Sequence, residues 1–247
     1  MKMAGVKYEL IYDELKKKIE AFEYNFQELL PSENTLIVTY DCSRNTVRRA
    51  IAQLVKAGYV QSLQGKGVRV IYEPQQQNSF TLAGIETFEE LAKRNNRIPS
   101  TKVLIFTDLI ADESIHRRTG LPVGSELYYI QRVRYLDGTP TILDHSFFLK
   151  EVTKGLTPEI AEKSIYHYLE QDLGVSIITS KRKITVEKAT DADVIHLDLD
   201  LNEHNCLAVV SNQTYNSDGV MFEFTASRHR PEFFSFQDTA TRTKPSF

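Results

Sequence analysis

The first third of the chain carries apolar positions at helical spacing, followed by short runs of β-branched residues. Residues 7–21 predict a helix with one buried face, because their apolar side chains recur every three or four positions. Ser32 and Ser43 are placed to cap two further helices, of which the second covers residues 44–57. Gly58 predicts a left-handed stop at the end of that helix.

A β-hairpin is predicted after these helices. Residues 59–63 and 68–72 favour strands, and a glycine-containing turn at 64–67 joins them. Three helices and a hairpin, with the two short helices separated by a tight turn, are typical of a winged helix-turn-helix. Domains of this class insert the N-terminal end of the second short helix into the major groove of DNA.

Beyond residue 82 the pattern changes to longer strands separated by short helices. A helix over 86–94 starts at Thr87, a candidate N-cap. β-rich runs follow at 102–109, 126–136, 141–149, 176–189, 207–215 and 220–229. Helical patterns lie at 114–119, 160–170 and 192–197. Hairpin turns at 137–138 and 216–219 join neighbouring strands, which predicts an antiparallel α+β domain.

The two patterns are separated by a polar, glutamine-rich stretch that is typical of a linker. We therefore expect a winged helix-turn-helix domain over 1–73, a linker over 74–82 and an α+β domain over 83–247. No apolar run of the sequence approaches the ~18 residues that a membrane helix needs. Charged residues recur throughout the first 20 positions, so we expect no secretory signal there. Two cysteines are too few for a disulfide framework. These features predict a cytoplasmic protein without membrane contact.

The charge of the chain changes the picture further. The overall formal net charge is -3, which by itself argues against a nucleic-acid partner. However, residues 1–73 hold 11 Lys and Arg against nine Asp and Glu, a net charge of +2, so the remainder has a net charge of -5. Residues 42–72 hold six basic residues and no acidic one. This stretch favours either a polyanion partner or a solvated basic face.

The second short helix begins with side chains suited to DNA. Arg44 and Arg48 can each pair with guanine through two donors, and Thr46 can contact a thymine methyl group or a phosphate. The backbone N–H groups at a helix start also suit a phosphate. The glycines of the hairpin turn let its tip approach DNA closely, where Lys66 reaches a phosphate or the minor groove.

Four motifs of this region resemble the GntR family of bacterial transcription regulators. They are Leu30-Pro31-Ser32-Glu33, Ser43-Arg44-Asn45-Thr46-Val47-Arg48, Gly58-Tyr59-Val60 and Gly65-Lys66-Gly67. The resemblance implies operator contacts at the recognition helix, the helix starts and the wing tip, namely Ser32, Ser43, Arg44, Asn45, Thr46, Arg48, Lys66 and Gly67. The chain departs from the family pattern at Asn34, where the family commonly has Arg, and at Val68-Arg69 after the wing glycines. These departures bear on the operator sequence.

The α+β domain lacks the usual motifs of an enzyme. It has no nucleophile elbow, no P-loop and no His or Cys spacing suited to a metal, so we expect neither catalysis nor a cofactor. Asp144, Glu187 and Glu223 leave a glycosidase-like carboxylate pair open as an alternative. Arg132 and Arg134 share one face of a predicted strand, where they form either a phosphate clamp or part of a surface ion-pair ladder.

Residues 84–88, 132–140 and 163–166 resemble the effector-binding UTRA domain of the HutC subfamily of GntR regulators. That domain is similar in fold to chorismate lyase, but it senses a ligand. The resemblance implies that a phosphate is held by Thr87, Arg132, Arg134 and Ser164. It also implies a sugar contact at Tyr166 and polar candidates for sugar hydroxyls at Asp144, Glu187, Glu223 and Arg228.

Residues 83–92, 163–170 and 225–230 are similar to the regulators of trehalose operons within this subfamily. That similarity implies trehalose-6-phosphate as the effector. We expect a homodimeric repressor that binds a palindromic operator, with half-sites about one helical turn (~34–36 Å) apart. Two alternatives stay open. The effector is another compound, such as N-acetylglucosamine-6-phosphate or a urocanate-like acid, or the chain is an enzyme acting on a sugar phosphate.

Overall fold

The computed structural model describes residues 4–73 and 84–236 of the 247-residue chain. These residues form two compact units, one on each side of the gap. The expected linker at 74–82 and the C-terminal residues 237–247 lie outside the described residues. No helix within the described ranges is both long and apolar enough to span a membrane.

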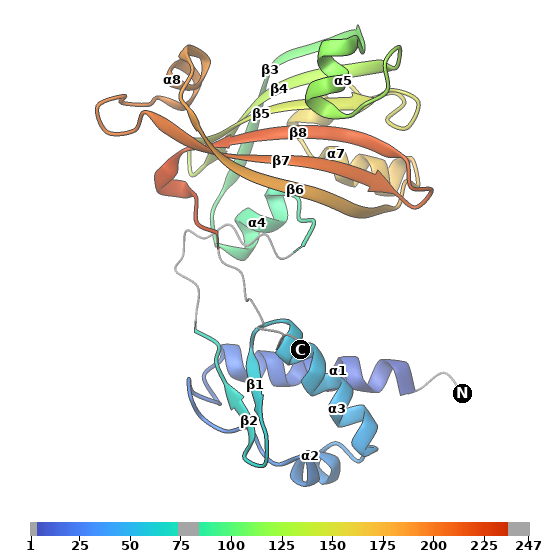
Figure 1. Cartoon of the computed structure of the whole chain (residues 1–247), viewed down its shortest axis with the longest axis vertical. Helices are drawn as coiled ribbons and strands as arrows, with labels where there is room; N and C mark the ends of the chain where they lie inside the picture. Colours follow the sequence, from blue (N-terminus) through green and yellow to red (C-terminus); the bar gives the residue numbers. More distant parts are fainter. Residues whose placement is uncertain (1–3, 74–83, 237–247) are drawn as a thin grey trace, which may run out of the picture. The chain divides into compact units, whose positions relative to one another are not determined.

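The N-terminal unit has three helices and a two-stranded antiparallel hairpin, coloured blue to cyan in Figure 1. Its elements are α1 (Ala4–Glu20), α2 (Glu33–Thr39), α3 (Arg44–Lys56), β1 (Val60–Leu63) and β2 (Gly67–Val70). The serine caps are confirmed, because Ser32 Oγ accepts a hydrogen bond from the Thr35 amide. Ser43 Oγ accepts one from the Thr46 amide in the same way. Gly58, just after α3, has φ +77°, as the sequence predicts.

The core of this unit comes from the helical spacing of its apolar residues. Leu15 and Ile19 of α1 pack with Val47 and Leu54 of α3, and all four side chains are almost wholly buried. A helix that buries one face leaves the other to solvent. The first turn of α3 and the hairpin tip are therefore exposed, which is the arrangement that a winged helix-turn-helix uses to reach DNA.

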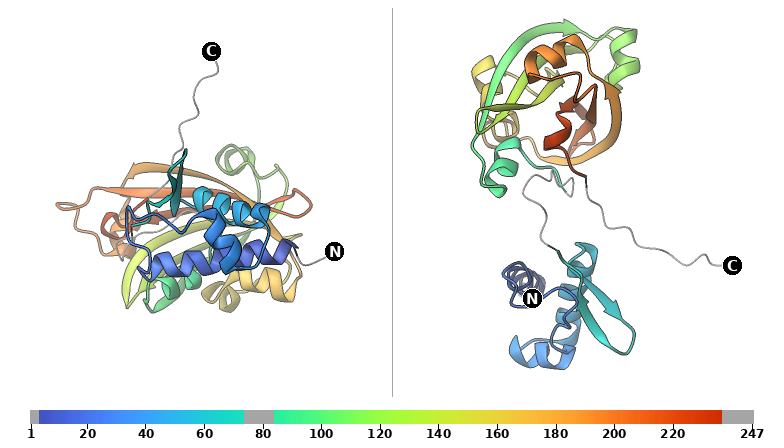
Figure 2. Two further views of the ribbon diagram at one scale, coloured as in Figure 1. Left: turned by 90° about the horizontal axis from the view of Figure 1, so that it is seen from below. Right: turned by 90° about the vertical axis from the view of Figure 1, so that its left-hand side faces the viewer.

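The C-terminal unit is an antiparallel α+β domain built on one six-stranded sheet (Figure 1). Its strands are β3 (Pro99–Ile110), β4 (Glu126–Leu136), β5 (Thr139–Leu149), β6 (Ile177–Lys188), β7 (Cys206–Asn216) and β8 (Met221–His229). Its α-helices are α4 (Phe88–Arg94), α5 (Glu113–Thr119), α6 (Pro158–Glu162), α7 (Ile165–His167) and α8 (Asp191–Leu197). The strand order is β3-β4-β5-β8-β7-β6, and Figure 2 shows that the sheet is twisted and curved.

The sheet has two differently covered faces, as strand alternation requires. Val133 of β4 and Leu143 of β5 pack against Leu197 of α8 on one face. Arg132 and Asp144, the next residues along the same strands, lie opposite each other in the register of β4 and β5 and point to the other face. That second face carries a cavity, so the register of these two strands decides which polar groups line it.

One predicted helix is wrong. The pattern over 160–170 predicts a single helix, but the structure breaks it at Lys163, whose ψ of -119° is not helical. Ser164 Oγ then accepts a hydrogen bond from the His167 amide and starts the separate helix α7. A π-helical turn at Tyr168–Asp172 follows. The break matters for function because it places Ser164 and Tyr166 on the wall of the cavity.

Candidate effector cavity and DNA-binding surface

The C-terminal unit contains a cavity of about 180 Å³ between one face of the sheet and the segments around α4 and α7. Strands β4, β5, β6, β7 and β8 all contribute side chains to it. Seven of the nine expected effector residues line this cavity, namely Thr87, Arg132, Arg134, Asp144, Ser164, Tyr166 and Glu223. The structure therefore brings together residues that lie up to 136 positions apart in the sequence.

The two strand arginines share a single carboxylate. Arg134 Nε donates to Asp144 Oδ2 at 2.8 Å, and Arg132 Nη2 lies 3.6 Å from the same oxygen. Ser227 Oγ donates to the other carboxylate oxygen at 2.7 Å. Asp144 is thus the counter-charge of the arginine pair, and it also lines the cavity, so its contact with sugar hydroxyls stays a prediction. Two guanidinium groups against one carboxylate leave an excess positive charge at this wall.

Arg132 has donor capacity that the described residues do not use. The residue is 3% exposed, and its Nη1 donates to the Ala161 carbonyl at 3.2 Å. Its buried Nε has no hydrogen-bond partner among the described residues. Burial, followed by the repulsion of Arg134, lowers the pKa of Arg132 to about 9, so the group stays a cation at neutral pH. A buried cation with a spare donor on a cavity wall suits an anionic ligand.

Two hydroxyl groups complete this end of the cavity. Thr87 Oγ1 accepts a hydrogen bond from the Glu90 amide in a capping box, and Ser164 Oγ caps α7. A hydroxyl that accepts through a lone pair keeps its O–H free to donate. Two cations and two donating hydroxyls on the wall of one cavity match the oxygens of a phosphate group better than those of a neutral sugar alone.

Tyr166 and Glu223 form a fixed polar part of the wall. The Tyr166 hydroxyl donates to Glu223 Oε2 at 2.5 Å, and Thr225 Oγ1 donates to Glu223 Oε1 at 2.7 Å. Burial, followed by the charge of Glu223, raises the pKa of Tyr166 well above its ordinary value. The phenol therefore remains protonated, and the pair offers oxygen acceptors suited to sugar hydroxyls.

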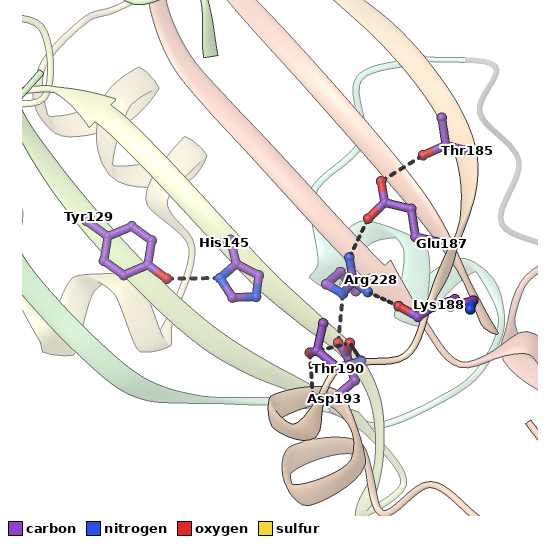
Figure 3. A network of polar contacts seen from close by, with 8 residues as sticks. All are labelled: Tyr129, His145, Thr185, Glu187, Lys188, Thr190, Asp193 and Arg228. Atoms are coloured by element: carbon purple, nitrogen blue, oxygen red, sulfur yellow. Dashed lines mark hydrogen bonds and ion pairs between the residues drawn. The ribbon is translucent and has the colours of Figure 1, made fainter. Parts of the chain in front are cut away.

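Glu187 and Arg228 do not line the cavity, and the expectation for these two residues is corrected. Arg228 donates from Nε to Asp193 Oδ1 at 2.8 Å and from Nη1 to Glu187 Oε2 at 2.7 Å (Figure 3). It also donates to the Lys188 carbonyl. Strand alternation explains the difference, because Arg228 points to the opposite side of β8 from Glu223. This network fastens β8 to the end of β6 and to α8.

The structure adds cavity residues that the sequence analysis does not name. The polar ones are Glu86, Glu89, Lys163, Ser180, Arg182, Asn212, Thr225, Ser227 and His229. Arg182 of β6 donates from Nε to Asn212 Oδ1 at 3.0 Å, since the two residues lie opposite each other in β6 and β7. Alternation along β6 indicates that Arg182 faces the cavity only when the pairing of β6 with β7 is already known.

The proposed DNA-binding residues cluster on one side of the N-terminal unit. Arg44 and Asn45 are exposed in the first turn of α3, and Lys66 and Gly67 are exposed at the hairpin tip. Gly67 has φ +104°, a conformation that favours glycine. The wing tip therefore combines an exposed cation with a backbone that carries no side chain at the point of closest approach.

Residues of α2 contact two of the three arginines of α3. Arg44 Nη2 donates to Asn34 Oδ1 at 2.9 Å, and Arg48 Nε lies 3.1 Å from a Glu33 carboxylate oxygen. Asn34 is one of the two places where the chain departs from the family pattern, and its side chain accepts a hydrogen bond from Arg44 of the recognition helix. Both pairs are exposed, so DNA phosphates and bases can compete for the same guanidinium groups.

An exposed basic helix with a wing, and a sheet that encloses a cationic cavity, define a ligand-responsive DNA-binding regulator. Residues 7–70 match the family of bacterial regulatory proteins, gntR family, and residues 94–235 match the UTRA domain. The chain belongs to the GntR family, in the HutC subfamily that carries the UTRA domain. It is a transcription regulator and not an enzyme; it binds DNA through the first unit and an effector through the second.

Known regulators resemble the chain over almost its whole length. It is 36% identical to the HTH-type transcriptional regulator TreR of Bacillus subtilis, over 96% of this chain and 98% of that protein. It is 26% identical to the repressor NagR of the same organism, over 93% and 92%. The solved effector-binding domain of the B. subtilis trehalose repressor is 35% identical, covers 59% of this chain and 99% of its own, and gives a TM-score of 0.51. YydK of B. subtilis supports the fold alone, with 21% identity, coverage of 95% and 99%, and a TM-score of 0.78.

Proposed function

We propose that the chain represses a sugar-utilisation operon and leaves its operator when it binds trehalose-6-phosphate. The observation that carries this proposal is the pair Arg132 and Arg134, which lines the cavity and shares the carboxylate of Asp144. The buried Nε of Arg132 has no hydrogen-bond partner among the described residues. A phosphate monoester carries close to two negative charges at neutral pH and offers three acceptor oxygens. Such a group supplies the counter-charge that Asp144 alone leaves incomplete.

Trehalose as the sugar is supported by the relatives. The chain is 36% identical to TreR of B. subtilis, and the trehalose repressor of that organism has a solved effector-binding domain that is 35% identical. The polar wall around Tyr166 and Glu223 suits sugar hydroxyls. A phosphorylated disaccharide combines both requirements, because its phosphate meets the cationic wall while its hydroxyls meet the polar wall.

The DNA-binding arrangement is proposed as a homodimer on a palindromic operator, with the winged helix domain over 1–73 and the sensor over 83–247. Each subunit is proposed to contact its half-site through its helix starts, its recognition helix and its wing tip, namely Ser32, Ser43, Arg44, Asn45, Thr46, Arg48, Lys66 and Gly67. Release requires that the ligand prefer an arrangement whose recognition helices do not match the operator spacing. A tenfold loss of operator affinity corresponds to about 1.4 kcal/mol of coupling.

Calorimetry on the full-length protein tests the effector. The panel contains trehalose-6-phosphate, trehalose, N-acetylglucosamine-6-phosphate and urocanate. We expect trehalose-6-phosphate to bind most tightly and to be recovered unchanged, since the chain is a regulator. Tighter binding of N-acetylglucosamine-6-phosphate would assign another sugar to the same phosphate site. Tighter binding of urocanate, or of trehalose without its phosphate, would overturn the phosphate assignment itself.

A further inference from the structure

Arg182 contacts two parts of the sensor that are remote in sequence. Its Nε donates to Asn212 Oδ1 at 3.0 Å, and its Nη2 donates to the Gly84 carbonyl at 3.0 Å. Its side chain also lines the effector cavity, close enough to Tyr166 for the two groups to interact electrostatically. One guanidinium group therefore touches both the cavity and the chain segment that begins at Gly84.

The segment that begins at Gly84 forms part of the cavity wall. Ile85, Thr87 and Phe88 line the cavity, and Gly84 directly follows residues 74–83, which connect the two units in sequence. α4 is held together internally by the capping box at Thr87 and by an ion pair between Glu86 and Arg94. These contacts favour movement of the stretch 84–94 as one piece.

The attachments of this stretch to the sheet differ along its length. Phe88 packs against an apolar cluster that includes Leu136 and Ile142, and the Arg134 guanidinium lies 5.2 Å from the centre of the Phe88 ring. Gly84 is held by the hydrogen bond that its carbonyl oxygen accepts from Arg182. Two arginines that line the cavity thus also contact the segment, Arg134 at Phe88 of α4 and Arg182 at Gly84.

We propose that Arg182 couples occupancy of the cavity to the DNA-binding unit. The proposal rests on the function proposed above and assigns the coupling to one side chain. Sugar oxygens at the β6 side of the cavity accept hydrogen bonds from the Arg182 guanidinium and compete with the Gly84 carbonyl for it. Because a ligand shifts an equilibrium only through contacts that differ between two states, a residue that bonds either the ligand or the segment meets the requirement. The phosphate wall supplies affinity, and Arg182 converts binding into release.

The test compares Arg182→Gln with Lys183→Gln, a neighbouring change on β6 that removes the same charge from an exposed side chain. Full-length proteins are titrated with trehalose-6-phosphate by calorimetry. Their affinity for an operator selected from a random DNA pool is then measured with and without saturating ligand. With saturating ligand, we expect the operator affinity of the wild type and of Lys183→Gln to fall by at least about tenfold, which corresponds to ~1.4 kcal/mol of coupling. Arg182→Gln is expected to bind the operator normally without ligand and to bind the ligand saturably. Its operator affinity is expected to fall by less than about threefold when the ligand is saturating.

The outcomes separate this proposal from the proposed function. If the wild type binds no trehalose-6-phosphate, or binds it without release, the proposed function fails. If the wild type is released and Arg182→Gln is released to the same extent at saturation, the coupling role of Arg182 is refuted.

A second measurement covers the case in which Arg182→Gln does not fold. Hydrogen exchange of the amides at 85–91 in the wild type is expected to change when trehalose-6-phosphate binds. Unchanged exchange there would contradict the proposal without any variant. Asn212→Ala, which removes the acceptor that orients Arg182 Nε, is expected to show an intermediate loss of coupling; full wild-type coupling in that variant would also count against it.

Discussion

Replacing Arg132 by methionine tests the phosphate wall most sharply. Methionine fills a similar elongated volume without charge, and Asp144 keeps its bonds to Arg134 Nε and Ser227 Oγ. In the native chain Arg132 Nη1 is engaged by the Ala161 carbonyl, Nη2 lies 3.6 Å from Asp144, and Nε has no hydrogen-bond partner among the described residues. The change therefore removes a ligand donor without leaving a buried carboxylate unpaired.

The expected magnitude follows from the donors that are lost. A hydrogen bond to a charged group contributes about 1.5–3 kcal/mol, and Arg132 is one of the two arginines that line the phosphate end of the proposed site. A loss of about 2–3 kcal/mol corresponds to a rise in Kd of roughly 30- to 150-fold. Trehalose without a phosphate does not use this donor, so its affinity is expected to change little.

The assay is calorimetric titration with trehalose-6-phosphate and with trehalose, on full-length Arg132→Met and on Arg117→Met. Arg117 is an exposed arginine of α5, and its replacement controls for the loss of one positive charge. Thermal unfolding and operator affinity show whether each variant is folded. The reasoning is refuted if Arg132→Met binds trehalose-6-phosphate as well as Arg117→Met, or if both ligands weaken equally.

Three further predictions concern DNA binding, stability and pH. Arg44→Ala is expected to weaken operator binding by about 1–3 kcal/mol in fluorescence anisotropy, while calorimetry shows ligand binding intact; retained operator affinity would remove Arg44 from the interface. Asp144→Asn leaves the buried Arg132 and the partly buried Arg134 without their carboxylate, so urea unfolding should show a loss of about 3–5 kcal/mol, and a loss below 1 kcal/mol would contradict the ion-pair description. Burial lowers the pKa of His229 from 6.5 to about 4, so its neutral form stabilises the fold above pH 6.5 and this contribution is lost as the pH falls towards 4. Between pH 7 and pH 5 the wild type should lose about 2 kcal/mol that His229→Gln does not lose, and equal losses in both would contradict the assignment.

Local signals in the sequence predicted most of the elements. The serine caps at Ser32 and Ser43 and the left-handed Gly58 depend only on neighbouring residues, and the structure confirms all three. The shared face of Arg132 and Arg134 likewise follows from alternation within one strand. Such features are accessible because they need no knowledge of which strands pair.

The remaining parts of the cavity depend on long-range pairing. Asp144 becomes the partner of Arg132 because β4 and β5 pair in that register, and Arg182 meets Asn212 because β6 pairs with β7. The turn at 137–138 predicts that β4 pairs with β5, but an unbroken register would place Arg132 opposite Leu143, and the register shift between Arg134 and Tyr135 brings Asp144 there instead. The pairing of β6 with β7 has no short hairpin turn to indicate it. Arg228 differs from these cases. It lies five positions after Glu223 on β8, so strand alternation already places the two side chains on opposite faces of the sheet.

The prediction of one helix over 160–170 is wrong for a local reason. Its apolar residues Ala161, Ile165 and Leu169 recur every four positions, so periodicity alone joins two helices. The N-cap signal of Ser164 competes with that pattern, and in the structure the cap prevails. The resulting break places Ser164 at the start of α7 and on the wall of the cavity.

The central claim is that a sugar phosphate in the sensor cavity releases the chain from DNA. The most direct measurement titrates trehalose-6-phosphate into the complex of the full-length protein with its selected operator and follows fluorescence anisotropy. We expect operator affinity to fall by at least about tenfold, and the fall to saturate at the same ligand concentration as the binding measured by calorimetry. Operator affinity that stays constant while the calorimeter records saturated binding would contradict it.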